Sequence, residues 1–308
     1  MTTNAIQSSH IYSTYFAPRG RSRIYTLGMQ IAQLYLSPFD QIIGFIGEAG
    51  SGKSVLIKGM FPGIELTNDD DGVNVRPLPL LEQEYETGFF TPHTYHLDIR
   101  FETGFHQLSE LADAVRLAVR RGKRIIIEHF DLIYPLLGVN ANLLIGVGEQ
   151  IVITRPNLFG PLPQELCDIV YPSLAYRLMA HSAEDLCEYA MTQEQMLACS
   201  HGDIRHGFVL EFNEHQPDID IPTLEARVNE LIRQDLPIDY YDESHILLGG
   251  VQHYCTGPRT HVRSTGRIIG FRLLDHFIYD HFHKTYMLVG CVGDDSEENI
   301  RKLEKIHG

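Results

Sequence analysis

Short apolar runs alternate with helical periodicity in the first half of the chain. Residues 41–46, 125–127 and 150–154 are nearly continuous apolar runs with the length of buried strands. Residues 64–66 form a shorter run of this kind, and residues 108–121 carry apolar side chains at helical spacing. Strands that alternate with helices are typical of a parallel sheet. The pattern therefore predicts an α/β domain with a parallel sheet.

The pattern changes after a segment rich in proline and glycine at residues 156–163. Beyond it we expect helices, a strand at 208–212, a helix at 223–233 and a strand-like apolar run at 286–289. These elements do not alternate regularly, which indicates a smaller α+β domain. We place the boundary near residue 170, so that the two domains span residues 1–170 and 171–308.

Composition places the chain among globular proteins, with 44% hydrophobic and 21% charged residues. No uninterrupted apolar run reaches 18 residues, so we expect no membrane span. The five cysteines are scattered and lack Cys-x-x-Cys spacing, which favours the reducing cytoplasm. The net charge of −15 repels polyanions, so a contact with nucleic acid needs a local basic patch.

Residues 47–54, GEAGSGKS, match the phosphate-binding pattern G-x-x-x-x-G-K-[ST]. The glycines allow backbone N–H groups to turn inward around phosphate groups, and the following helix directs its positive end at them. Lys53 neutralises the terminal phosphates, and the Ser54 hydroxyl is suited to ligate Mg²⁺. A nucleoside triphosphate is the expected ligand. Its expected binding residues are Gly47, Gly50, Ser51, Gly52, Lys53 and Ser54.

Acidic residues elsewhere in this half are the candidates for the rest of the site. Glu128 ends an apolar strand, where a parallel strand meets a nucleotide site, and is the first choice as a second Mg²⁺ ligand. Asp131 is the second choice. Asp69 and Asp70 lie in an acidic turn after the run at 64–66 and could accept a proton from an attacking hydroxyl, with a solvated turn as the alternative.

Residues 40–155 resemble the P-loop kinases of the uridine kinase and phosphoribulokinase type. The resemblance rests on GEAGSGKS, on the acidic cluster, on TPHTYHLDIRF at 91–101 and on IIIEHFDLIYP at 125–135. It implies an ATP-dependent phosphotransferase with Mg²⁺ as cofactor and a small molecule, not identified by the sequence, as phosphoryl acceptor. Lys53 would then stabilise the transferred group, and Asp69 or Asp70 would act on the acceptor.

Residues 172–290 resemble the second additional domain of alanyl-tRNA synthetase, which is its editing domain. Thr260-His261-Val262, Thr265-Gly266, Ile268 and Phe271 follow the pattern of that domain. The resemblance implies Cys255 and His261 as zinc ligands. Two departures leave Zn²⁺ open: five residues separate Cys255 from His261 where the family has three, and the His-x-x-x-His pair of the family is missing. Substitute ligands could come from His181, His201, His206 or His253, and the sequence does not choose among them.

Two functions from different classes follow. The first is the ATP-dependent phosphotransferase, with the second domain selecting the acceptor. The alternative is a zinc-dependent protein that binds or deacylates aminoacyl-tRNA and is regulated by ATP. A tRNA end could meet the arginine patch formed by Arg259, Arg263, Arg267 and Arg272, although a solvated basic face paired with acids explains these residues equally well. A nucleotide-binding regulatory protein without turnover is a third reading.

Overall fold

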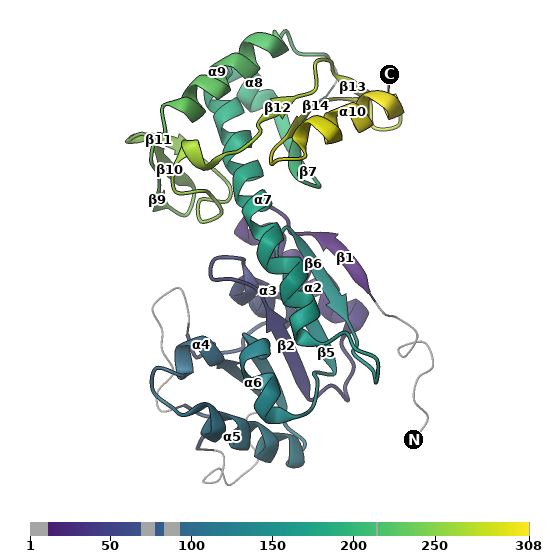
Figure 1. The fold of residues 1–308 in the computed structure, drawn as a ribbon, viewed down its shortest axis with the longest axis vertical. Helices are drawn as coiled ribbons and strands as arrows, with labels where there is room; N and C mark the ends of the chain where they lie inside the picture. The colour runs from purple at the N-terminus through teal and green to yellow at the C-terminus, as the bar shows by residue number, and fades with distance from the viewer. Residues whose placement is uncertain (1–11, 69–77, 83–92, 214, 308) are drawn as a thin grey trace. The chain divides into compact units, whose positions relative to one another are not determined.

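The computed structural model describes residues 12–68, 78–82, 93–213 and 215–307 (Figure 1). The chain divides into two compact units, one of residues 1–17 and 21–172 and one of residues 18–20 and 173–308. The long helix α7 (Pro163–Ala190) contributes its first part to unit 1 and its second part to unit 2.

Unit 1 is built on a sheet of six strands in the order β1-β6-β5-β2-β4-β3 (Figure 1). The strands are β1 (Ser13–Phe16), β2 (Ile42–Ile46), β3 (Thr94–Asp98), β4 (Arg124–Glu128), β5 (Leu143–Val147) and β6 (Gln150–Thr154). The four strands β3, β4, β2 and β5 are parallel. Strand β6 is antiparallel to β5, and β1 is antiparallel to β6.

The prediction of a parallel sheet is therefore wrong, because β6 and β1 make the sheet mixed. Only Gly148 and Glu149 separate β5 from β6. Two residues can close a hairpin between antiparallel strands, whereas a parallel connection needs a crossover of a dozen residues or more. The strand expected at 64–66 is also absent, since this segment has no regular secondary structure.

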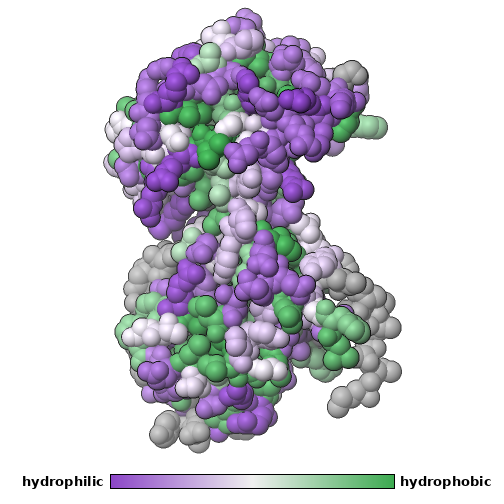
Figure 2. All heavy atoms as spheres, viewed as in Figure 1, coloured by the Kyte–Doolittle hydropathy of each residue, from purple (hydrophilic) through white to green (hydrophobic). Residues whose placement is uncertain are grey.

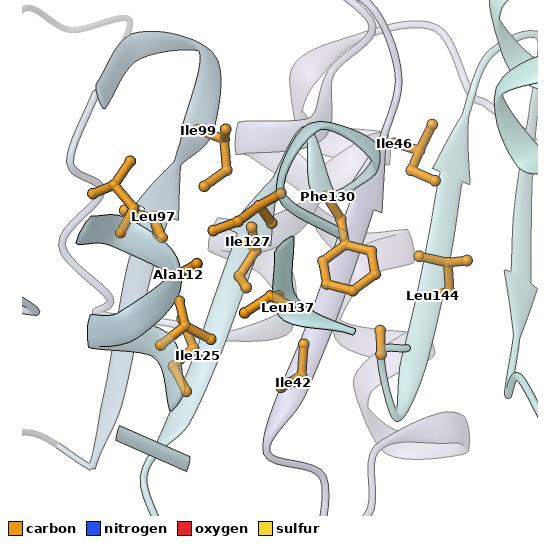
Figure 3. Close-up of a cluster of buried hydrophobic side chains, with 14 of the residues drawn as sticks. Ile42, Ile46, Leu97, Ile99, Ala112, Ile125, Ile127, Phe130, Leu137 and Leu144 are labelled. Carbon is orange, nitrogen blue, oxygen red and sulfur yellow. The ribbon is translucent and has the colours of Figure 1, made fainter. Parts of the chain in front are cut away.

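Helices cover both faces of this sheet. They are α2 (Arg21–Tyr35), α3 (Lys53–Met60), α4 (Ile99–Glu102), α5 (Leu108–Arg120), α6 (Phe130–Leu137) and the first part of α7. Alternate residues of β2 enter different cores, since Ile43 and Phe45 pack with α2 and α3 while Ile42 and Ile46 pack with α5 and α6. Figure 3 shows the second of these cores, with the Phe130 ring near the centre and Leu144 beside it.

Unit 2 contains two antiparallel sheets. The larger has the order β12-β14-β8-β7, with β13 beside β14, and the smaller has the order β11-β10-β9. Its strands are β7 (Cys199–Ile204), β8 (Gly207–Asn213), β9 (Ile238–Asp242), β10 (His245–Leu248), β11 (Val251–Tyr254), β12 (Arg272–Leu273), β13 (Ile278–Asp280) and β14 (Thr285–Cys291). Its helices are the second part of α7, α8 (Gln193–Ala198), α9 (Ile221–Arg233), the 3₁₀ turn η1 (Thr265–Arg267) and α10 (Ser296–His307).

The core of unit 2 surrounds the second part of α7, where all residues from 181 to 188 are buried. Hydrophilic residues cover most of the face of this unit that Figure 2 shows. None of the helices in the described part of the chain is both long and apolar enough to cross a membrane. The second part of α7, which is buried and carries several ionisable side chains, distinguishes this unit.

Candidate functional site

The loop that joins β2 to α3 has the backbone shape of an anion cradle. Gly47, Gly50 and Gly52 have φ values of 154°, 79° and 92°, a region that favours glycine. A Cβ atom on Gly47 would lie 2.5 Å from the carbonyl oxygen of Val147, so the backbone approach leaves no room for a side chain. Helix α3 begins at Lys53, and Gly52 provides no side-chain cap for its first N–H groups.

Three side chains from two elements meet beside this loop. The Lys53 ammonium donates hydrogen bonds to the carbonyl oxygens of Gly47 and Glu48, both at 2.9 Å. Its Nζ lies 3.8 Å from Oε2 of Glu128, and the Ser54 hydroxyl donates to Oε1 of Glu128 at 3.2 Å. Lys53, Ser54 and Glu128, which the sequence proposed as parts of one site, thus lie together.

His96 holds the Glu128 carboxylate in place. The backbone N–H of Thr67 donates to Nδ1 of His96 at 3.1 Å, so this nitrogen carries no proton. The other ring nitrogen, Nε2, therefore donates to Oε1 of Glu128 at 3.1 Å. His96 was not among the residues predicted from the sequence, and its contact with Glu128 depends on the pairing of β3 with β4.

The electrostatics of this site favour a charged pair. Burial lowers the pKa of Lys53 below its usual range, against the opposing effect of Glu128. Burial also raises the pKa of Glu128, but the hydrogen bond from His96 and the charge of Lys53 outweigh it and hold that pKa below its usual range. The pKa of the adjacent His129 falls to about 4 because of its burial and the charge of Lys53. Lys53 is thus the buried cation of the site, and Glu128 is its counterion.

Asp131, the second choice as a Mg²⁺ ligand, does not join this group. Asp69 and Asp70 lie outside the described residues. Asp131 lies on α6, where the Tyr171 hydroxyl donates to Oδ2 of Asp131 at 3.4 Å and burial raises the pKa of the carboxyl group. The interactions of Asp131 are therefore on α6 and α7, and Glu128 is the carboxylate beside Ser54.

Cys255 and His261 also lie together, in unit 2. The Cys255 sulfur is 3.7 Å from Nε2 of His261, and this nitrogen is 2.6 Å from Oδ2 of Asp185. The Nδ1–H of His261 donates to the carbonyl oxygen of Pro258 at 3.3 Å, which orients the ring. Asp185 was not predicted from the sequence, although His181 and Asp185 lie four residues apart, on one face of a helix.

A cation of the protein already occupies this group. The buried guanidinium of Arg19 pairs with Glu184 and Asp185, and it donates to the Cys255 sulfur at 2.9 Å. Burial and the charge of Asp185 raise the pKa of the Cys255 thiol to about 12. Cys255 is therefore a neutral thiol beside a guanidinium in this structure, and its role as a zinc ligand stays a prediction.

The arginine patch of unit 2 is partly neutralised by acids. Arg259 lies 3.4 Å from Glu243 and stacks over Tyr240, with 4.4 Å between the guanidinium carbon and the ring centre. Arg272 lies 3.2 Å from Glu225. These pairs favour the paired basic face over a free phosphate-binding patch at two of its four arginines.

Comparisons with known proteins find no matching family model and no matching curated protein. Two solved structures show similarity along most of the chain. The pyridoxal-5′-phosphate dependent protein YhfS from Escherichia coli is 13% identical, with 96% of this chain and 80% of that chain covered and a TM-score of 0.27. An amino transferase from Eubacterium rectale is 12% identical, with 97% and 75% covered and a TM-score of 0.23.

These findings correct the family assignments made from the sequence. The structures found carry the names of a pyridoxal-phosphate dependent protein and an amino transferase, and neither is a P-loop kinase or a tRNA-editing protein. With no family model and no curated protein to support either family, the expected phosphotransferase, its aminoacyl-tRNA alternative, and ATP and Mg²⁺ as cofactors of phosphoryl transfer are withdrawn. The motifs that suggested them are short, and a short motif does not fix the family around it. The TM-scores are too low to show a shared fold, so pyridoxal phosphate is not assigned to this chain.

Proposed function

We propose that unit 1 binds a nucleoside triphosphate through its phosphate groups at residues 47–54. The observation that carries this proposal is the position of Lys53 at the start of α3, after a loop of left-handed glycines, with its ammonium directed back at the loop. Backbone N–H groups of the loop and of the first helical turn supply hydrogen-bond donors to the phosphates, and the helix dipole favours their negative charge. The cytoplasm is the proposed location.

Lys53 is the residue that changes partners when a phosphate enters. Its ammonium is satisfied by two carbonyl oxygens of the loop, which a phosphate oxygen can replace with a stronger, charge-assisted bond. The hydroxyl of Ser54 and the carboxylate of Glu128 form the opposite side of this group. Because the Glu128 carboxylate would repel a phosphate, we expect it to contact the ligand through an intervening cation or water. Phosphoryl transfer is not part of the proposal.

Calorimetric titration of the full chain tests this proposal. A nucleoside triphosphate and inorganic triphosphate should both bind, whereas the nucleoside without phosphate should not. Lys53→Met should weaken binding by about 10- to 100-fold, the range expected for the loss of a hydrogen bond to a charged group. The matched control is Lys58→Met on the same helix, which should bind as the wild type does. The titration is repeated with a chelator to detect a bridging divalent cation.

Two results would refute the proposal. One is equal affinity of the wild type and Lys53→Met for the nucleoside triphosphate. The other is that no nucleotide binds while pyridoxal phosphate binds at the same loop. Pyridoxal phosphate serves here as a phosphate monoester whose visible absorbance reports its binding.

A further inference from the structure

Three ionisable side chains of unit 2 converge on the carboxylate of Glu188. Glu188 lies on the buried part of α7, and Cys199 and His201 lie at the start of β7. Because they are two residues apart on a strand, Cys199 and His201 point to the same face. His253 comes from β11 in the other sheet. The group thus joins a helix and both sheets of the unit.

The distances among Glu188, Cys199 and His201 are those of a metal-ligand set, and His253 lies within ligand distance of Glu188 in a separate set with Asp185. The Cys199 sulfur lies 3.8 Å from Oε1 of Glu188, and Nε2 of His201 contacts the same oxygen. Nε2 of His253 lies 3.8 Å from Oε2 of Glu188. The ligand atoms of Glu188, Cys199 and His201 all lie within 4.8 Å of one another. In a tetrahedral site with bonds of about 2.0–2.3 Å, ligand atoms are separated by about 3.3–3.8 Å.

His253 supplies an independent observation. Its side chain is 8% exposed, and its Nε2 has no hydrogen-bond partner among the described residues. At 3.8 Å, the Glu188 carboxylate is beyond hydrogen-bond distance from it. Buried polar atoms in proteins are almost always paired, with protein, water or an ion. Nε2 of His253 therefore requires a partner beyond the described residues, and it lies beside Glu188.

We propose that Glu188, Cys199, His201 and His253 bind a divalent transition-metal ion. A thiolate and two imidazoles with a carboxylate suit a borderline ion such as Zn²⁺ or Co²⁺, whereas Mg²⁺ and Ca²⁺ prefer oxygen ligands. On binding, the Cys199 thiol loses its proton to solvent and its sulfur bonds to the metal. Once the His253 ring moves toward Cys199 and His201, four protein ligands close the coordination sphere, so the ion has a structural role and ties β7 and β11 to α7.

The neighbouring group around Cys255 is the competing position for a metal. There the guanidinium of Arg19 already contacts Asp185 and the Cys255 sulfur. A second cation would be repelled by this buried charge and would have to displace it. Glu188, by contrast, lies within ion-pair distance of two histidines, and a histidine can release its proton to solvent when a metal ion binds.

Cobalt substitution distinguishes these two positions, because each contains one cysteine. Metal-free full-length protein is titrated with Co²⁺, and absorption from sulfur-to-cobalt charge transfer is recorded. We expect one equivalent to bind, the band to disappear in Cys199→Ser, and the band to remain in Cys255→Ser. His253→Gln should weaken Co²⁺ binding by at least about 10- to 100-fold, because even the loss of a residue that only hydrogen-bonds to a metal ligand costs that much. Circular dichroism confirms that each variant is folded.

A second measurement uses only the wild-type chain. Alkylation by iodoacetamide is followed by mass spectrometry, and Zn²⁺ should protect Cys199 far more strongly than the other cysteines. No binding of Co²⁺ or Zn²⁺, a band that persists in Cys199→Ser and is lost in Cys255→Ser, or alkylation of Cys199 unaffected by Zn²⁺ would each overturn the proposal. Because every ligand lies in unit 2, the result does not depend on nucleotide binding by unit 1.

Discussion

The substitution Glu128→Gln tests whether Lys53 is held as a buried ion pair. The amide oxygen of the new side chain can still accept the hydrogen bonds that Nε2–H of His96 and the Ser54 hydroxyl donate, so the change removes charge and retains shape. The Lys53 ammonium, which is 5% exposed, then loses its counterion at 3.8 Å. We expect unit 1 of the variant to be destabilised in the absence of ligand.

The magnitude follows from the distance. Two unit charges 3.8 Å apart attract each other by about 4 kcal/mol at an effective dielectric constant of about 20. Deprotonation of Lys53 limits the cost, because moving a lysine from its ordinary pKa of about 10.4 to neutrality costs about 5 kcal/mol at pH 7 and about 2 kcal/mol at pH 9. A lysine with a depressed folded-state pKa binds fewer protons when folded, so stability rises with pH in this range. The cost of Glu128→Gln should therefore fall from about 4 to about 2 kcal/mol between pH 7 and pH 9.

Hydrogen exchange read by mass spectrometry on peptides from β2 and β4 measures this cost. It reports unit 1 separately, whereas global unfolding of a protein with two units need not have one transition. The control is Glu48→Gln, which removes the Glu48–Arg100 pair at 3.1 Å, where both side chains are more than two-fifths exposed, and should cost under about 1 kcal/mol. A cost of Glu128→Gln no larger than the control, or one that does not fall at pH 9, would refute the ion-pair argument.

Two further predictions concern the loop and the buried helix. Gly47→Ala should destabilise unit 1 by about 1–3 kcal/mol or more, because φ is 154° and the new Cβ would lie 2.5 Å from the carbonyl oxygen of Val147. Gly50→Ala should cost less, because its Cβ would have no atom within 4 Å. Hydrogen exchange of the β2 amides measures both costs, and equal costs would contradict the steric reason. Burial lowers the pKa of His181 to about 3, so the folded state favours the neutral ring. The unfolded chain binds a proton at this residue below about pH 6.5, so unit 2 should lose stability as the pH falls further, by up to about 1.4 kcal/mol per pH unit. Urea unfolding at pH 5 to 7 should show a shallower pH dependence in His181→Gln; an unchanged slope would show that this residue does not titrate on unfolding.

The elements of unit 1 that could be predicted are those with local signals. Continuous apolar runs indicated β2, β4 and β6, because a strand buried on both faces carries few polar residues. The direction of β6 was missed, since apolarity has no direction and only the two-residue connection to β5 shows that the pair is antiparallel. A run of three residues at 64–66 is too short to distinguish a strand from a loop.

The candidate site was predictable to the extent that it depends on sequence motifs and strand ends. Lys53 and Ser54 belong to one eight-residue pattern. Glu128, 74 residues away from Ser54, was reached because parallel neighbours β2 and β4 place their ends together, with Phe45 opposite Glu128. His96 lies within β3, whose sequence is TYHLD, and no pattern in the sequence shows that its ring contacts Glu128. The contact depends on the register of β3 against β4, which no local pattern encodes.

Unit 2 illustrates a different limit, which is set by charge balance over long separations. Glu184, Asp185 and Glu188 are all buried on one helix, and three buried carboxylates require positive partners. Arg19, 165 residues before Glu184, satisfies the first two, and the sequence gives no signal of that contact. The ion pairs of Glu188 within the described residues are both with histidines, whose charge depends on pH. Both of these histidines can release a proton and become neutral metal ligands, whereas Arg19 keeps its charge beside Cys255, which is the physical reason to look for a metal ion at Glu188 rather than at Cys255.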